Sequence, residues 1–261
     1  RNRFYDIGIL KSHDFDVPVI SVGNITVGGT GKTTHIEYLA SLLKEQFEVA
    51  VLSRGYKRKS KGFRWVEVDT TVEEAGDEPA QIKRKFPEVT VAVCENRLTG
   101  IRRLFSEENP KIPDLVLLDD AFQHRRISPG INILLIDYNR PVWKDSLLPA
   151  GRLREGAVQV RRAGIIVFTK CNENEVTPIQ RRLISKEIDL KPYQQLYFST
   201  YQYGKIKHLF SGKELSEDFY KDNSYSVLVV TGIANPLPVY EYINKYADDV
   251  KYLSFPDHHN F

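Results

Sequence analysis

The chain has 261 residues, of which 41% are hydrophobic and 27% are charged, and its formal net charge is +3. This composition indicates a globular protein with one large core, or one core and a small appended lobe. No run of 18 or more apolar residues occurs, which excludes a membrane-spanning helix within these residues. The two cysteines, Cys94 and Cys171, have no C-x-x-C partner and indicate reduced thiols in a cytoplasmic compartment.

The first predicted element is a strand at residues 17–22, which leads through a glycine-rich turn into a helix. The turn reads Thr26-Val27-Gly28-Gly29-Thr30-Gly31-Lys32-Thr33, and Thr34 follows. Its glycines leave backbone N–H groups free to converge on phosphate oxygens at a helix N-terminus. Lys32 would reach the β- and γ-phosphates, and the Thr33 hydroxyl would ligate Mg²⁺. The sequence therefore predicts a nucleotide-binding P-loop, with a plain glycine-rich turn as the alternative because Thr26 replaces the usual first glycine.

Apolar runs rich in Val, Ile and Leu alternate with helical stretches along the rest of the chain. The expected strands lie at residues 48–53, 89–94, 115–118, 131–136, 165–169 and 227–231, and the expected crossover helices at 33–44, 77–86 and 96–106. Continuous apolar strands joined by helices are typical of a parallel sheet that is buried on both faces. The predicted fold is therefore α/β: a three-layer, doubly wound, mostly parallel sheet of the P-loop NTPase type with a smaller second lobe.

The sheet-like pattern weakens at about residue 172 and returns at residue 226. We therefore expect a P-loop core over residues 1–171, a smaller second lobe over 172–225, and a return to the core sheet over 226–261. A turn after the last expected strand leads into a helix that begins near Pro236.

Basic residues are concentrated in one loop-like stretch after the second expected strand, namely Arg54, Lys57, Arg58, Lys59, Lys61 and Arg64. Such a cluster favours an anionic partner, which is a nucleic acid, an acidic membrane surface or a phosphorylated substrate. A solvated charged loop explains the same pattern equally well.

Two acidic motifs are suited to kinase chemistry. Asp77 lies in Gly76-Asp77-Glu78-Pro79, just before a helix, where it caps the helix, accepts the proton of a substrate hydroxyl, or does both. Asp119 and Asp120 end an apolar strand, the position expected for carboxylates that hold Mg²⁺ or its waters beside a P-loop. Helix capping is the plain alternative for such strand-end aspartates.

Three later segments also carry candidate site residues. The loop after Asp120 holds Gln123 and His124, at the kind of strand exit where ligands of open α/β sheets bind, although a structural histidine is the alternative. In the charged turn at residues 147–155, Glu155 is a further candidate metal ligand, and Arg152 or Arg154 is expected to neutralise phosphate. The loop Phe255-Pro256-Asp257-His258-His259 pairs an acid with imidazoles, of which at most one is expected to act on a substrate.

In chain order, these motifs resemble those of the tetraacyldisaccharide 4′-kinases, the lipid A 4′-kinases of Gram-negative bacteria. The resemblance spans nearly all of the chain and rests on six motifs: Ser21-Val22-Gly23-Asn24 with the P-loop, Ser53-Arg54-Gly55-Tyr56, Gly76-Asp77-Glu78-Pro79, Asp119 to His124, Leu148 to Glu155, and Phe255 to His259. Ala121, Lys57 and Arg152 depart from residues common in the family, which affects local loop geometry but not the reaction.

The resemblance implies an ATP- and Mg²⁺-dependent transfer of the γ-phosphate to the 4′-hydroxyl of tetraacyldisaccharide 1-phosphate. It places Lys32 and Thr33 on the nucleotide and Mg²⁺, and Asp119, Asp120 and Glu155 around the metal. Asp77, paired with His258 in preference to His259, resembles the base that activates the hydroxyl. The positions that match substrate or phosphate contacts in the family are Arg97, Gln123, His124 and Arg154.

The resemblance also implies a peripheral location at the cytoplasmic face of the bacterial inner membrane. The implied partners are the lipid A disaccharide precursor and the anionic membrane surface, with no nucleic acid and no obligate protein partner. Clustered Lys and Arg contribute about 1 kcal/mol each at such a surface, which agrees with the basic stretch. We expect residues 1–10 to be the end of an interfacial helix, and residues to be missing at both ends, because the chain has no methionine and the family continues past Phe261.

The main alternative is a P-loop switch ATPase of the partitioning type, which binds DNA or a membrane through basic patches. That class has a signature lysine where this chain has Val27, and a switch has no need for Asp77, Glu155 and His258. A nucleotide-binding module without catalysis is a third possibility, in which the loss of Asp77 would leave every function intact.

Overall fold

The computed structural model describes residues 2–107, 109, 111–172, 174–221, 225–233 and 235–256. The chain forms two compact units, Arg1–Thr200 and Tyr201–Phe261. The first unit contains all of the predicted site residues except those in the loop at residues 255–259.

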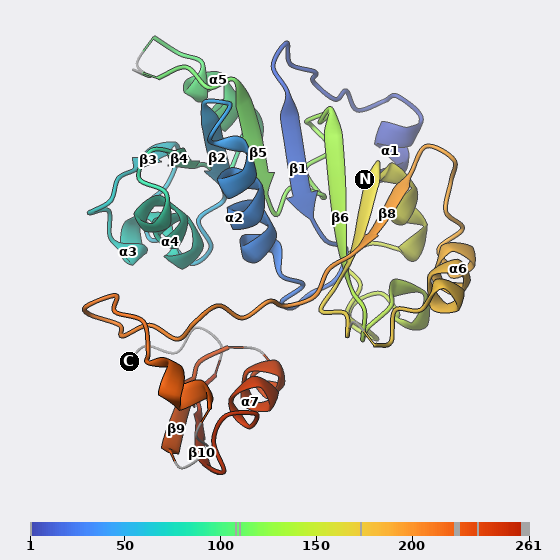
Figure 1. Ribbon diagram of the computed structural model, residues 1–261. Coiled ribbons are helices and arrows are strands. Elements are labelled where there is room, and N and C mark those ends of the chain that lie inside the picture. The colour runs from blue at the N-terminus through green and yellow to red at the C-terminus, as the bar shows by residue number, and fades with distance from the viewer. Residues whose placement is uncertain are drawn as a thin grey trace. The chain divides into compact units, whose positions relative to one another are not determined.

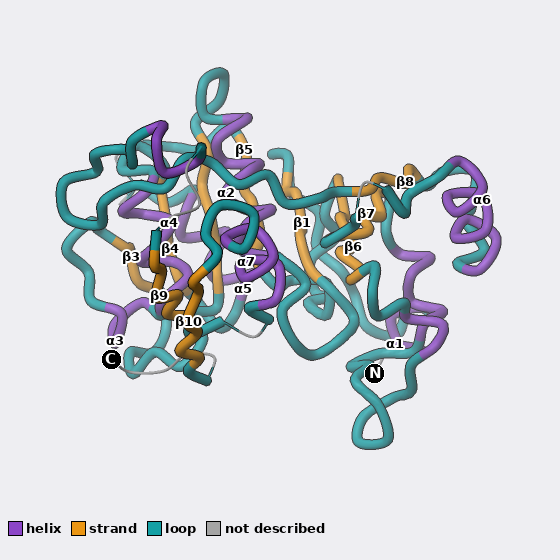
Figure 2. The backbone as a smooth tube through the Cα atoms, turned by 60° about the horizontal axis from the view of Figure 1, so that its bottom comes forward, coloured by secondary structure: helices purple, strands orange, loops and turns teal. Residues whose placement is uncertain are grey.

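The first unit is built on an eight-stranded sheet with the strand order β3-β4-β2-β5-β1-β6-β7-β8 (Figure 1). Only β3 runs antiparallel to its neighbour, β4. Figure 2 shows the strands side by side from β3 and β4 to β8. The strands are β1 (Val19–Gly23), β2 (Val49–Ser53), β3 (Arg64–Val66), β4 (Thr90–Val93), β5 (Leu115–Asp119), β6 (Ile131–Asp137), β7 (Ile165–Thr169) and β8 (Gln195–Phe198).

Helices cover both faces of this sheet. Alternate residues of each central strand point to opposite faces, so each strand packs against helices on both sides. In β2, Val49 and Val51 pack in the same cluster as Ile36 of α2, whereas Ala50 and Leu52 pack with Ile101 of α5. The predicted three-layer, doubly wound α/β fold is thus confirmed. The helices of the first unit are α1 (Asn2–Asp6), α2 (Lys32–Leu43), α3 (Val72–Ala75), α4 (Asp77–Lys85), α5 (Arg97–Leu104) and α6 (Pro178–Glu187), with short 3₁₀ helices η1 (Val142–Lys144) and η2 (Ala157–Arg162).

The topology brings the loops that follow the parallel strands to one edge of the sheet. β1 lies between β5 and β6, and the chain moves from β1 to one side to form β2, β4 and β5, then to the other side to form β6, β7 and β8. Ligands of open α/β sheets bind beyond the carboxyl ends of the strands at such a switch point. The loop after β1, which is the predicted P-loop, occupies this point.

The division into units differs from the predicted domain boundaries. β8 pairs in parallel with β7 and completes the main sheet, so residues 172–200 belong to the core and not to a second lobe. Its alternation of exposed and half-buried residues is that of an edge strand covered on one face, which gives a weak pattern in the sequence.

The second unit has its own two-stranded parallel sheet of β9 (Ser226–Thr231) and β10 (Asp249–Ser254), with α7 (Leu237–Ile243) and the short η3 (Glu217–Tyr220). The expected return of residues 226–261 to the core sheet is therefore wrong for the described residues. The apolar run of β9 predicts a strand correctly, but it carries no information about which sheet the strand joins. The helix expected near Pro236 is present as α7.

Gly55 shows how tightly two of the sequence motifs approach each other. It has a φ of +72°, and a Cβ at this position would lie 2.5 Å from the carbonyl oxygen of Ala75. The segment after β2 therefore packs directly on the turn that leads into α4 and Asp77.

We expect Gly55→Ala to destabilise the protein more than Gly62→Ala does. Gly62 has a similar φ of +76°, but a Cβ added there would meet no atom within 4 Å, so this position isolates the backbone cost of a left-handed alanine. The steric clash at Gly55 should add about 2 kcal/mol to the loss in the free energy of unfolding, measured by urea denaturation. Equal losses in the two variants would contradict this close packing.

Candidate active site

The phosphate-binding loop joins the end of β1 at Gly23 to the start of α2 at Lys32. Gly28 and Gly31 have φ values of +98° and +82°, a conformation that side chains disfavour. The Asn24 side-chain amide donates a hydrogen bond of 2.9 Å to the Thr30 hydroxyl, and both residues are fully buried. The loop is therefore closed on itself by its own residues, as a preformed phosphate site requires.

A second segment lies alongside the first half of this loop. The Val27 N–H donates to the Arg152 carbonyl, and the Arg154 N–H donates to the Ile25 carbonyl, each at 2.8 Å. This pairing carries Arg154 to the mouth of the loop, where its guanidinium contacts the Asp120 carboxylate at 3.1 Å. Arg154 thus lies beside the strand-end acids, and its contact with substrate or phosphate stays a prediction.

Asp120 is held between two cations. Lys32 Nζ lies 3.7 Å from Asp120 Oδ1, whereas Arg154 makes its closer contact with Oδ2. Burial alone would raise the pKa of Asp120, but the positive charges of Lys32 and Arg154 outweigh it and lower the pKa. Asp120 is therefore an ionised carboxylate that orients the P-loop lysine.

Asp119 differs from its neighbour because it is fully buried. The Ser53 hydroxyl donates to Asp119 Oδ2 at 3.0 Å, whereas Oδ1 has no hydrogen-bond partner among the described residues. Burial and the nearby charge of Asp120 raise the pKa of Asp119. An unpaired buried carboxylate oxygen is costly unless a cation or a donor joins it.

Glu78 lies in the motif Gly76-Asp77-Glu78-Pro79, but its sequence context predicts no role for it. The Thr33 hydroxyl donates a hydrogen bond of 3.0 Å to Glu78 Oε1. Burial and the charge of Asp119 raise the pKa of Glu78. The contact also brings the start of α4, and with it Asp77, to the start of α2.

The oxygen atoms of Thr33, Glu78 and Asp119 fit Mg²⁺. This ion prefers hard oxygen ligands and usually keeps waters and substrate phosphates in its shell, with only one or two carboxylates from the protein. In the described part of the chain, no group of three His, Cys, Asp or Glu residues makes a protein-only metal cage. The strongest indication of a cation site is Asp119 Oδ1, which is buried without a hydrogen-bond partner among the described residues.

Glu155, the other predicted metal ligand, is engaged elsewhere. One of its carboxylate oxygens forms an ion pair with Arg162, and the other accepts a hydrogen bond of 3.0 Å from Asn2. With both oxygens used in this way, Glu155 links the N-terminal helix to η2, and the structure gives no support to a metal-binding role.

Arg97 supports the site from beneath. Predicted to contact substrate or phosphate, it is only 2% exposed, and its guanidinium donates to the carbonyls of Cys94 and Asp119 at 2.7 and 2.9 Å. Burial lowers its pKa to about 10, against the opposing effect of Asp119. Arg97 therefore fixes the end of β5, and the prediction of substrate contact does not fit its burial.

Gln123 and His124 lie in the loop after Asp120. The Gln123 amide donates to the Asn24 carbonyl at 2.6 Å, which ties this loop to the start of the P-loop. His124 lines a cavity of about 220 Å³ together with Ser21, Arg125 and Asn132. Gln123 therefore lies next to the predicted P-loop, whereas His124 faces a separate cavity and its substrate contact stays a prediction. Asp257, His258 and His259 lie outside the described residues.

Three of the six basic residues after β2 form ion pairs with glutamates. Arg58 contacts Glu95 at 2.7 Å, Lys59 contacts Glu73 at 2.9 Å, and Arg64 pairs with Glu74. Such pairs explain half of the clustered charges within the fold, so the cluster is a weaker indication of an anionic partner than its sequence suggests.

Comparisons with known proteins give a consistent result. A family model described as LpxK, tetraacyldisaccharide-1-P 4′-kinase, matches residues 1–261. The chain is 51% identical to the tetraacyldisaccharide 4′-kinase of Phocaeicola vulgatus and 45% identical to that of Flavobacterium johnsoniae, in each case over 100% of this chain and over 71% and 74% of the relative. A crystal structure of LpxK from Aquifex aeolicus in complex with ATP is 37% identical, with a TM-score of 0.74 over 99% of this chain and 77% of that chain.

Glu78→Gln should stabilise the protein in the absence of nucleotide while weakening its binding of Mg²⁺ and ATP. Because the pKa of Glu78 is raised, the folded protein holds this proton more tightly than the unfolded chain, so stability is lost as the pH rises above the ordinary glutamate pKa. The variant should have the higher melting temperature at about pH 7.5, and the difference should shrink at about pH 4.

Thermal unfolding at the two pH values, with a titration of ATP in Mg²⁺, tests this expectation. Glu88→Gln is the matched control, because a hydrogen bond from Lys44 lowers the pKa of Glu88 and its loss should not raise the melting temperature. A melting temperature of Glu78→Gln below that of the parent at neutral pH would contradict the assignment.

Proposed function

Since the chain belongs to the tetraacyldisaccharide-1-phosphate 4′-kinase family, we propose which of its residues carry out the ATP-dependent phosphorylation of the 4′-hydroxyl. The reaction is a step of lipid A biosynthesis, and its acceptor is tetraacyldisaccharide 1-phosphate. The observation that carries the residue assignment is the meeting of Lys32, Thr33, Glu78, Asp119 and Asp120 at the switch point of the sheet.

The nucleotide phosphates bind in the loop from Gly28 to Thr34. The backbone N–H groups of the loop and the N-terminus of α2 surround the phosphates, and Lys32 moves from Asp120 toward the β- and γ-phosphates when they bind. Support comes from the 3.7 Å separation of Lys32 and Asp120, which keeps the ammonium group at the mouth of the loop. Arg154, which also contacts Asp120, is positioned to contribute a second positive charge.

Thr33, Glu78 and Asp119 would hold Mg²⁺, with Asp120 near it. When bound, the ion neutralises charge on the β- and γ-phosphate oxygens. Around it, the chain supplies an oriented hydroxyl at Thr33 and the carboxyl groups of Glu78 and Asp119, whose pKa values are both raised and whose ionised forms a cation would stabilise.

Asp77 accepts the proton of the 4′-hydroxyl. As the oxygen of this hydroxyl forms its bond to the γ-phosphorus, the bond from that phosphorus to the β,γ-bridging oxygen breaks, ADP leaves, and the proton passes to the Asp77 carboxylate. Asp77 directly precedes Glu78, which contacts Thr33, so the carboxylate starts α4 beside the start of α2. A histidine of the 257–259 segment, with His258 favoured, is the proposed partner of Asp77.

The switch ATPase is not favoured. The chain lacks the signature lysine at Val27 and matches the kinase family over its whole length. A switch that only hydrolyses ATP also has no use for a carboxylate poised to accept a proton from a lipid hydroxyl.

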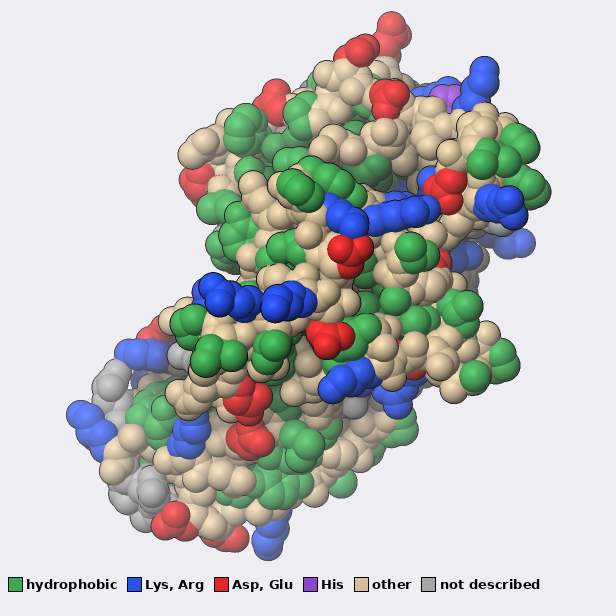
Figure 3. Space-filling model, turned by 90° about the vertical axis from the view of Figure 1, so that its right-hand side faces the viewer, with side chains coloured by type: hydrophobic (Ala, Val, Ile, Leu, Met, Phe, Trp, Pro, Cys, Tyr) green, Lys and Arg blue, Asp and Glu red, His purple; other side chains and the backbone are tan. Residues whose placement is uncertain are grey.

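The enzyme meets its lipid substrate as a peripheral protein at the cytoplasmic face of the inner membrane. Arg125 holds α1 against the rest of the first unit, because its guanidinium contacts Asp6 at 2.8 Å and lies over the Tyr5 ring. Phe4, Ile7 and Ile9 nevertheless stay at least half exposed. Figure 3 shows hydrophobic, basic and acidic side chains mixed on one face, so the exposed side chains of the N-terminal segment carry this proposal. Within the described residues, no helix has the length and apolar character to span a bilayer.

Replacement of Asp77 tests the assignment of the base. Asp77→Asn should lower kcat by about 100-fold or more, the usual contribution of a general base, and leave the Kd for ATP nearly unchanged. Lys32→Ala is the comparison, because it should weaken both nucleotide binding and turnover. The measurements are radiolabelled phosphate transfer to the lipid and calorimetric titration of ATP. Full activity of Asp77→Asn would overturn the role of Asp77.

A double substitution in the N-terminal segment tests the membrane contact. Phe4→Ser with Ile7→Ser in the full-length protein should weaken binding to phosphatidylglycerol-containing vesicles by about tenfold or more, because two apolar side chains no longer enter the lipid. Ile179→Ser, at a 74% exposed position on α6, is the matched control and should not change binding. Co-sedimentation measures both. Unchanged sedimentation of the double variant would show that another surface makes the contact.

A further inference from the structure

The carbonyl oxygens on the outer side of the phosphate-binding loop need hydrogen-bond donors. A loop that turns its N–H groups inward toward phosphate turns its carbonyl oxygens outward, where each accepts a hydrogen bond from the protein or from water. In this chain, the carbonyls of Gly29, Thr30 and Gly31 accept hydrogen bonds from side chains outside the loop. Three consecutive carbonyls are thus held from behind.

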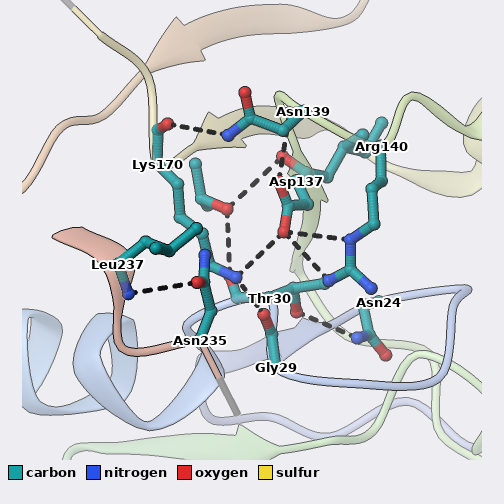
Figure 4. Close-up of polar contacts among 11 residues, drawn as sticks. Asn24, Gly29, Thr30, Asp137, Asn139, Arg140, Lys170, Asn235 and Leu237 are labelled. Carbon is teal, nitrogen blue, oxygen red and sulfur yellow. Dashed lines mark hydrogen bonds and ion pairs between the residues drawn. The ribbon is translucent and has the colours of Figure 1, made fainter. Parts of the chain in front are cut away.

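The donors come from the end of β7 and from α2. Lys170 Nζ donates to the Gly29 carbonyl, and the Thr169 hydroxyl donates to the Thr30 carbonyl at 3.0 Å (Figure 4). His35 Nδ1 lies 2.8 Å from the Gly31 carbonyl, which only accepts, so Nδ1 carries the proton. Burial lowers the pKa of His35 and keeps the imidazole neutral. None of these residues was singled out by the sequence motifs.

Lys170 is itself held in one place. Asp137, only 5% exposed at the end of β6, contacts Lys170 Nζ through Oδ2 at 2.9 Å. Arg140 contacts the same oxygen at 2.9 Å, so Asp137 is shared between two cations, as Figure 4 shows. Lys170 has a φ of +59°, a strained conformation for a residue with a side chain, and such strain persists where the surroundings require it.

We propose that Lys170, oriented by Asp137, is a positioning residue for ATP: it holds the Gly29 peptide so that the phosphate-binding loop presents its N–H groups to the nucleotide. Lys170 acts on the backbone of the loop and not on the reacting atoms, and Thr169 does the same at the next carbonyl. This role rests on the nucleotide-binding role proposed above for the loop. According to this proposal, the residues at the end of β7 contribute to ATP affinity together with the loop itself.

The alternative is that Lys170 only stabilises the fold through its ion pair. The two roles differ because Arg140 stays on Asp137 when Lys170 is replaced, so Asp137 keeps a partner and no buried charge is abandoned. Loss of the Lys170 side chain should then affect the loop more than the global stability.

Lys170→Met in the full-length enzyme tests the proposal. The Kd and KM for ATP should rise about tenfold, the effect of losing one charge-assisted hydrogen bond, while the KM for the lipid acceptor and the melting temperature stay close to those of the parent. Lys170→Arg should restore most of the affinity. Lys44→Met, which removes an exposed ion pair with Glu88 remote from the loop, is the control and should leave ATP binding unchanged.

Thr169→Val provides a second, independent variant, because it removes the donor to the Thr30 carbonyl with almost no change in shape. It should also raise the Kd for ATP without changing the KM for the lipid. Parental ATP affinity in both Lys170→Met and Thr169→Val would overturn the proposal, as would parallel losses of ATP affinity and melting temperature. Failure of the parent enzyme itself to bind ATP would instead refute the nucleotide-binding role of the loop.

Discussion

A phosphate-binding loop works only while its backbone N–H groups point inward, and much of the first unit serves this constraint. Gly28 and Gly31 supply the left-handed backbone that the loop needs, and the contact between Asn24 and Thr30 closes it. Neighbouring segments then hold it from three directions: the turn around Arg152 along its first half, Gln123 at its start, and the end of β7 behind its tip. The loop is thus shaped before any nucleotide arrives, which lowers the ordering cost of binding.

Asp119 and Asp120, the adjacent carboxylates at the end of β5, differ in their electrostatic surroundings. Asp120 is ionised between Lys32 and Arg154, whereas Asp119 is buried with one oxygen unpaired and shares its surroundings with Glu78. The raised pKa values of Asp119 and Glu78 show that their surroundings disfavour the ionised forms, which a bound cation would stabilise in the proposed Mg²⁺ site. Strongly perturbed carboxyl groups are often functional, which supports the proposal for Asp119 and Glu78.

The sequence was sufficient to predict β1, β2, β4 to β7 and β9, the crossover helices and the glycine-rich turn after β1, because continuous apolar runs and such a turn are local signals. It failed where the answer depends on tertiary contacts. The edge strand β8 alternates too weakly to be assigned to the core, and β9 has an apolar run that does not specify its sheet. The burial of Arg97 and the competing partners of Glu155 do not support the roles expected for them, and neither feature is visible in a motif. Glu78 stood in a recognised motif beside Asp77, but only its contact with Thr33 reveals its place in the site. Lys170 has no local signal at all, since its partner Gly29 is distant in sequence.

The most direct test of the central claim is transfer of radiolabelled γ-phosphate from ATP to tetraacyldisaccharide 1-phosphate by the full-length protein in detergent micelles, with free phosphate measured in parallel. The account predicts labelled lipid in proportion to the ATP consumed, with the new phosphate on the 4′-oxygen by nuclear magnetic resonance. Release of free phosphate without labelled lipid, stimulated by DNA or a protein partner, would contradict it and identify a switch ATPase.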